Sequence, residues 1–148
     1  MVCCFFGHKE VPAGLGEFLV PVLTELISDG VDYFLLGSQG EFDRTVLHSL
    51  RLLKRTYPNI EYKIVLAYMP DNANRSASID PMETIYPEGL ECVHPRYAIS
   101  WRNKWMIQES DVVVTYVAHS WGGAAKFEQM AYKKKKRVIN VASLMTHE

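Results

Sequence analysis

Three glycine-bearing segments, each directly after a predicted strand, hold the residues of this sequence best suited to binding a ligand. The segments are Gly7-His8-Lys9, Gly37-Ser38-Gln39-Gly40 and His119-Ser120-Trp121-Gly122-Gly123. The glycine pair of the third segment opens a predicted helix, where backbone N–H groups and the positive end of the helix dipole favour an anion. The alternative is a tight turn in which glycine only supplies unusual backbone angles.

Charged side chains near these segments could complete such a site. Arg102 shares a face of a predicted helix with Met106 and could project near the edge of the sheet, although a solvated arginine is the commoner outcome. Glu128 lies among alanines in the helix that follows Gly123. A glutamate on an inward face needs a partner or a ligand, because burial without one is costly. An exposed glutamate is the equally common alternative.

Two histidines also follow predicted strands. His8 and His119 could each contact a phosphate or transfer a proton, and an ordinary loop histidine is at least as common for each. The chain has neither a G-x-G-x-x-G fingerprint nor a G-x-x-x-x-G-K-[ST] loop. Cys92 and His94 form a lone C-x-H, which is a weak metal signal. We therefore expect no metal site and no tightly bound cofactor.

The elements that must position these residues follow from hydrophobic patterning. Short apolar runs predict strands, and apolar residues at i, i+3, i+4 and i+7 predict helices. Their alternation is typical of βαβ units around a parallel sheet. The predicted strands cover residues 2–6, 33–36, 61–68, 111–117 and 137–142, and the predicted helices cover about 15–27, 38–57, 95–110 and 123–136. An S-x-x-E capping box at Ser38 and Glu41 opens the second helix, and Pro95 suits the first turn of the third.

The order of these elements predicts an α/β fold of three layers with a five-stranded, mainly parallel sheet. In an open parallel sheet, ligands bind beyond the carboxyl ends of the strands, at the point where the strand order reverses. With the order 3-2-1-4-5, that point lies between the first and fourth predicted strands. The three glycine-bearing segments would then gather in one crevice.

Residues 69–94 differ from the rest of the chain in proline content and in hydrophobic periodicity. They hold Pro70, Pro81 and Pro87 and show little periodicity, which indicates either a disordered insertion or a functional flap. A flap is favoured because the segment has side chains worth burying, namely Ile79, Met82, Ile85, Tyr86 and Leu90. We treat it as an insertion in a single domain that spans residues 1–148.

Composition narrows the class of protein further. The chain has 148 residues, 48% of them hydrophobic and 22% charged, as expected for one globular domain. A formal net charge of −1 argues against nucleic-acid and membrane partners, and the basic run at 133–136 is interpreted as a solvated helix end. No apolar run approaches the ~18 residues that span a bilayer. The start lacks a signal-peptide pattern, and adjacent Cys3 and Cys4 point to opposite faces of a strand, so a cytoplasmic protein is expected.

Four blocks of the sequence occur in an order and spacing that point to a known family. They are Gly7-His8-Lys9, the run from Gly37 to Asp43, Arg102-Asn103-Lys104-Trp105-Met106, and the strand leading to Gly122-Gly123. Together they resemble the SLOG superfamily, which comprises Rossmann-like domains related to the SMF/DprA and LOG proteins, and most of all its small YpsA-like bacterial members. The resemblance covers nearly the whole chain. It implies a Rossmann-like fold with a site for a nucleotide or a nucleotide-derived ligand.

The resemblance also implies a function and an alternative to it. The first is binding or sensing of a nucleotide-derived small molecule; the alternative is LOG-like hydrolysis of the N-glycosidic bond of nucleoside monophosphates. Of the LOG motif R-K-x-x-M, Arg102 and Met106 are present and Asn103 replaces the lysine. Aligning Glu128 with the glutamate of P-G-G-x-G-T-x-x-E retains one glycine of that motif. In a hydrolase, Glu128 would stabilise the ribosyl transition state and Arg102 the phosphate.

The ligand-binding residues that follow from these considerations come from all four blocks. Asp43 and Gln39 could hold ribose hydroxyls or a base edge, although an acid in the first turn of a helix is favoured by the dipole alone. LOG-like relatives suggest a homodimer with the tryptophan-bearing helix as a contact, while DNA binding in the manner of DprA ranks third. The predicted ligand-binding set is Gly7, His8, Gly37, Ser38, Gln39, Gly40, Asp43, Arg102, Asn103, His119, Gly122 and Gly123.

Overall fold

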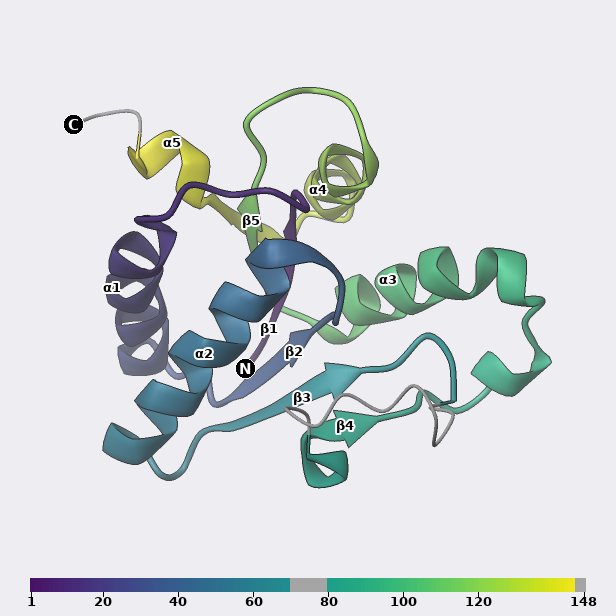
Figure 1. Cartoon of the computed structure of the whole chain (residues 1–148), viewed down its shortest axis with the longest axis horizontal. Coiled ribbons are helices and arrows are strands. Elements are labelled where there is room, and N and C mark those ends of the chain that lie inside the picture. The colour runs from purple at the N-terminus through teal and green to yellow at the C-terminus, as the bar shows by residue number, and fades with distance from the viewer. Residues whose placement is uncertain (70–79, 146–148) are drawn as a thin grey trace.

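Residues 1–69 and 80–145, which the computed structural model describes, fold around a six-stranded parallel sheet (Figure 1). In sheet order the strands are β4 (Thr84–Ile85), β3 (Glu61–Val65), β2 (Tyr33–Leu36), β1 (Val2–Gly7), β5 (Val112–Tyr116) and β6 (Arg137–Asn140). The α-helices are α1 (Leu15–Ser28), α2 (Gly40–Thr56), α3 (Ala98–Glu109), α4 (Gly123–Lys133) and α5 (Val141–Met145). None of the helices in these residues is long and apolar enough to cross a membrane.

Helices cover both faces of the sheet (Figure 1). On one face, α1, α2 and α5 pack on a core that includes Cys3 and Phe5. On the other face, α3 and α4 pack on a second core that includes Cys4 and Phe6. The two adjacent cysteines are therefore buried on opposite sides of β1, as the twofold period of a strand predicts.

The predicted strand order is confirmed. The five predicted strands correspond to β3, β2, β1, β5 and β6 in the order 3-2-1-4-5, and the order reverses at β1, which pairs with both β2 and β5. A sixth strand, β4, extends the sheet beyond β3 and has only two residues, too few to produce a recognisable alternation. The chain has a Rossmann-like α/β fold with an all-parallel sheet.

The start of α2 differs from the prediction. Its N-cap is Gln39, and no side chain caps it, so the capping box of Ser38 and Glu41 is wrong. The carboxylate of Glu41 accepts a hydrogen bond from the backbone N–H of Val11 at 3.1 Å instead. A tertiary contact between the first turn of α2 and the loop that holds Val11 thus uses the carboxylate that the sequence analysis assigned to a cap.

Other boundaries are shorter than predicted. Pro95 lies in a 3₁₀ turn, Pro95–Tyr97, and α3 begins after it at Ala98. β3 ends at Val65, and β6 ends at Asn140 because α5 follows at once. These changes shorten individual elements and leave their order along the sheet as predicted.

The segment expected to be a flap adds an edge to the sheet in its described part. Besides β4, it forms 3₁₀ turns at Pro81–Glu83 and Leu90–Cys92. Leu90 is 2% exposed and packs in a small core with Ala67 and Ala98, which confirms that prediction, whereas Met82 is 77% exposed and its predicted burial is wrong. Residues 70–79 of the expected flap, Ile79 among them, lie outside the described residues.

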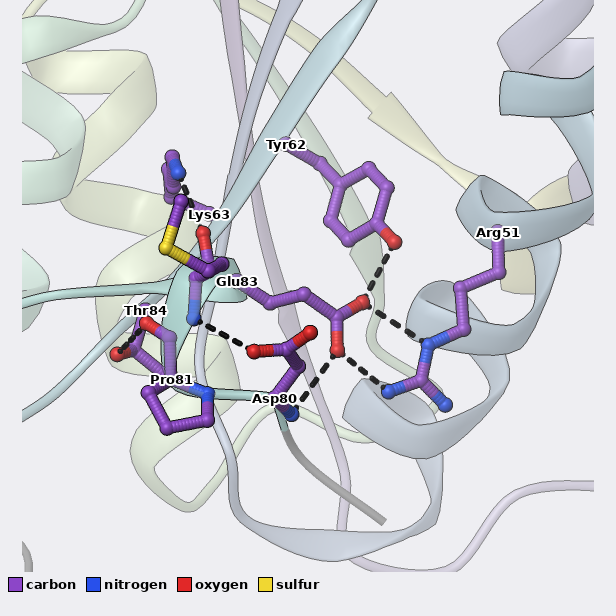
Figure 2. Close-up of polar contacts among 8 residues, drawn as sticks. Arg51, Tyr62, Lys63, Asp80, Pro81, Glu83 and Thr84 are labelled. Carbon is purple, nitrogen blue, oxygen red and sulfur yellow. Dashed lines mark hydrogen bonds and ion pairs between the residues drawn. The ribbon is translucent and has the colours of Figure 1, made fainter.

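Glu83 ties this segment to the rest of the domain (Figure 2). Its Oε1 accepts a hydrogen bond from Arg51 Nη2 at 2.7 Å, and its Oε2 accepts hydrogen bonds from Arg51 Nε at 3.0 Å and the Tyr62 hydroxyl at 2.5 Å. Arg51 lies on α2 and Tyr62 on β3, so one carboxylate joins the edge segment to a helix and a strand. These bonds, first those from Arg51, lower the pKa of Glu83 to about 2.

Replacing Glu83 by glutamine removes the charge from this network. We expect Glu83→Gln to lower the free energy of unfolding at pH 7 by about 1–2 kcal/mol, because hydrogen bonds to charged groups are the stronger ones. A carboxyl whose folded pKa lies below its unfolded value stabilises the fold above the unfolded pKa, so the difference shrinks as the pH falls from 4.5 toward 2. Urea unfolding at pH 7 and pH 3 measures both effects. Glu88→Gln, at an exposed glutamate of the same segment, is the control; equal losses in the two variants would contradict the expectation.

Candidate functional site

A cavity of about 680 Å³ opens at the carboxyl end of the sheet, where the strand order reverses. All three glycine-bearing segments contribute to its wall, together with α3 and the start of α4. The predicted convergence of these segments is therefore observed. Of the predicted site residues, those that line the cavity are Gly7, His8, Gly37, Gln39, Asp43, Arg102, Asn103, His119, Gly122 and Gly123.

Two of the glycines serve close packing between the first two segments. A Cβ on Gly7 would lie 2.2 Å from Cγ of Phe42, and a Cβ on Gly40, which has φ +89°, would lie 2.8 Å from Cα of Lys9. The backbone N–H of Glu41 also donates to the Lys9 carbonyl at 2.8 Å. The absence of side chains at Gly7 and Gly40 thus allows the end of β1 and the loop after it to pack against the start of α2. Gly40 itself does not line the cavity.

Arg102 provides a buried positive charge in the cavity wall. The residue is 4% exposed, and its Nη1 and Nε donate to the Val65 carbonyl at 3.3 Å and to Asn103 Oδ1 at 3.1 Å. No carboxylate in the described residues is in ion-pair contact with it. Its Nη2 forms no hydrogen bond within residues 1–69 and 80–145. Every buried polar side-chain atom in these residues has a hydrogen-bond partner, so Nη2 is not fully buried and is open to the cavity that Arg102 lines. Burial lowers the pKa of this guanidinium, and Asp43 opposes that shift.

Gly37 keeps open the space between this guanidinium and a carboxyl group. A Cβ on Gly37 would lie 2.9 Å from Asp43 Oδ2 and 3.4 Å from Arg102 Nη2. Asp43 Oδ2 accepts the backbone N–H of Gln39 at 2.9 Å. Burial raises the pKa of Asp43 to about 6, against the opposing effects of the Gln39 N–H and of Arg102. A donor and an acceptor of hydrogen bonds therefore flank one small space.

Three stacked rings form another part of the wall. The His8 and His119 rings lie 3.8 Å apart at 13°, and the His119 and Trp121 rings lie 3.7 Å apart at 16°. His8 Nε2 accepts the backbone N–H of Ala118 at 2.9 Å, and the His8 ring stands at 89° to the Tyr116 ring. Burial, and next the neighbouring His119, lowers the pKa of His8. The rings fix the loop between β5 and α4 against the end of β1.

The start of α4 is open to the same cavity. Gly122 has φ +95°, and a Cβ on Gly123 would meet nothing within 4 Å. No side chain caps this helix end. The uncapped start of α4 therefore lies at the cavity wall, and the anion site expected there stays a prediction.

Besides Gly40, two further predicted residues lie outside the cavity lining. The carboxylate of Glu128 accepts the hydroxyl of Thr115, which is buried on β5, and Glu128 does not line the cavity. Ser38 is exposed and also lies outside the cavity lining. The sequence analysis expected that a glutamate on an inward face would have either a protein partner or a ligand. Glu128 has a protein partner, Thr115. No group of three or more His, Cys, Asp or Glu that could hold a metal occurs in the described part of the chain.

Trp121 is one of the cavity-lining residues that the predicted set does not contain. It lines the cavity, stacks on His119 and is 71% exposed. The usable signal was its position, because a large aromatic residue between His119 and the glycine pair has no helix or strand in which to be buried.

Comparison with models of known protein families gives no match to this chain, and comparison with curated proteins gives none either. The resemblance to the SLOG superfamily therefore rests on the residues quoted above. The fold and the cavity are the observations from which a function must be argued.

The raised pKa of Asp43 predicts that its charge destabilises the folded protein. Because the folded pKa, about 6, is above the ordinary 3.8, the native state binds the proton more tightly, and stability is lost as the pH rises through 6. Asp43→Asn retains an acceptor for the Gln39 N–H without the charge. We expect it to raise the free energy of unfolding by about 1–3 kcal/mol at pH 7.5 and to change it little at pH 4. Urea unfolding at both pH values tests this.

Glu10→Gln is the matched control, since Glu10 is an exposed carboxyl at the same cavity. Its effect on stability should be small at both pH values. An Asp43→Asn variant that is less stable than the wild type at pH 7.5 would show that the carboxylate is held by favourable contacts.

Proposed function

We propose that this protein binds a nucleotide or a nucleotide-derived small molecule at the carboxyl ends of its strands, with the phosphate between Arg102 and the start of α4. The observation that supports this most directly is the buried guanidinium of Arg102, which lines the cavity and has no ion-pair partner in the described residues. A buried charge without a partner costs free energy. An anionic ligand would offset that cost.

The surroundings of Arg102 fit a phosphate. Nη2 is open to the cavity, and the uncapped N–H groups after Gly122 provide further donors at the positive end of a helix dipole. The site lies where the strand order reverses, the usual position of ligands in open α/β sheets. Its volume, about 680 Å³, is within the range of small-molecule sites.

Asp43 and Gln39 would hold the sugar in this proposal. Both line the cavity, and within residues 1–69 and 80–145 the Asp43 carboxyl accepts a hydrogen bond only from the Gln39 N–H, which leaves acceptor capacity for hydroxyl groups. A ribose ring offers such hydroxyls close to its phosphate. Asp43 would thus bind the sugar and Arg102 the phosphate of the same ligand.

The resemblance to the SLOG superfamily, and to its YpsA-like members, supports the same ligand class, and we include that family assignment in the proposal. Relatives of the LOG type suggest a homodimer, which stays a prediction. Hydrolysis of the N-glycosidic bond is the less favoured alternative, because the carboxylate of Glu128 is bonded to Thr115 and lies outside the cavity lining. We therefore propose binding without turnover.

Calorimetric titration with AMP tests the role of Arg102. We expect Arg102→Met to weaken binding at least about tenfold, because charge-assisted hydrogen bonds to phosphate are strong. Arg102→Lys should retain part of the affinity, since lysine keeps the charge and loses the two-pronged geometry. Arg55→Met, at an exposed arginine of α2, is the control and should bind like the wild type.

Equal affinity of the wild type and Arg102→Met, or no binding of AMP by the wild type, would refute the proposal. Incubation with a panel of nucleoside monophosphates and an assay for free base separates binding from turnover. Base release that disappears in Glu128→Ala would establish the hydrolase instead.

A further inference from the structure

The stack of His8, His119 and Trp121 ends in a ring with one free face. The imidazole of His119 covers part of one side of the Trp121 indole, and no other aromatic ring in the described residues stacks on it. Trp121 nevertheless remains 71% exposed. A stacked imidazole is smaller than an indole, so this exposure requires the opposite face of the indole to be open.

Holding the loop does not by itself require a tryptophan at this position. The loop is already fixed by the hydrogen bond from the Ala118 N–H to His8 Nε2 and by the 2.8 Å contact between His119 Nδ1 and the Trp121 carbonyl. Neither contact uses the indole. Ligand sites are lined largely by hydrophobic and aromatic side chains, and Trp121 is an exposed aromatic residue in the lining of this cavity.

The position of the indole relative to the anion site suggests its partner. Trp121 directly precedes Gly122, whose neighbour Gly123 begins α4, and Trp121 lines the same cavity as Arg102. A ligand with its anionic group at Arg102 and the start of α4 therefore has the Trp121 ring within the same enclosure. A planar ring attached to that ligand could extend the column of stacked rings.

We propose that Trp121 is the stacking platform for a heteroaromatic base, so that the ligand is a nucleotide carrying its base and not a bare sugar phosphate. This inference rests on the proposed function and specifies the class of ligand. Every nucleobase has a π-face, and stacking of a base on an aromatic side chain tolerates base identity. The platform should therefore distinguish AMP from ribose 5-phosphate much more strongly than it distinguishes AMP from UMP.

Calorimetric titrations of the full chain with AMP and with ribose 5-phosphate test this directly. We expect the wild type to bind AMP about tenfold more tightly than ribose 5-phosphate. Trp121→Ala should reduce this ratio to near one while leaving the affinity for ribose 5-phosphate unchanged. Trp121→Phe keeps an aromatic face and should retain most of the ratio. Tyr132→Ala, at an exposed aromatic of α4 that does not line the cavity, should keep the wild-type ratio.

Fluorescence provides a second measurement that does not depend on the alanine variant being folded. AMP should quench tryptophan emission in the wild type, ribose 5-phosphate should not, and the quenching should be lost in Trp121→Phe although Trp101 and Trp105 remain. A ratio near one in the wild type, or a ratio that survives Trp121→Ala, overturns the inference and leaves the proposed function standing. Failure of both ligands to bind the wild type overturns the proposed function itself.

Discussion

The positive charge of Arg102, held in the wall of a cavity with no carboxylate in contact, is the constraint on which the rest of the site depends. Removing a guanidinium from water costs free energy, and hydrogen bonds to the Val65 carbonyl and Asn103 offset that cost only in part. Asp43 attracts it from a greater distance, yet burial makes the charge of Asp43 unfavourable as well. A buried guanidinium and a partly buried carboxyl group thus face a space where a ligand could satisfy both.

The topology explains how backbone donors come to lie beside this charge. The carboxyl ends of neighbouring parallel strands meet at one edge, and the reversal of strand order at β1 separates the loops after β1 and β5 enough to leave a crevice. The glycines then divide by role. Gly7 and Gly40 allow close packing of two loops, Gly37 leaves room between Asp43 and Arg102, and Gly123 opens a helix end to the cavity.

Much of this arrangement could be predicted from the sequence, because apolar runs and helical periodicity depend on burial that the fold must provide. The strands and helices followed from them, and the order 3-2-1-4-5, taken as a premise, then predicted the convergence of the glycine-bearing segments. Periodicity predicts the helix face on which Arg102 lies but not whether another element covers that face. The burial of Arg102 therefore could not be predicted. The predicted capping box at Ser38 is wrong, because the Glu41 carboxylate accepts a hydrogen bond from the Val11 N–H instead. The hydrogen bond between Thr115 and Glu128 joins a strand to a helix, and only the fold determines which residues of the two elements face each other. Strand β4 was too short to leave a pattern.

The most direct test of this account is a crystal structure of the wild-type protein with bound AMP. The account predicts a phosphate oxygen within hydrogen-bond distance of Arg102 Nη2 and a second one at the backbone N–H groups that begin α4. AMP bound outside the cavity, or an Arg102 side chain turned away from the phosphate and paired with a carboxylate of the protein, would contradict it.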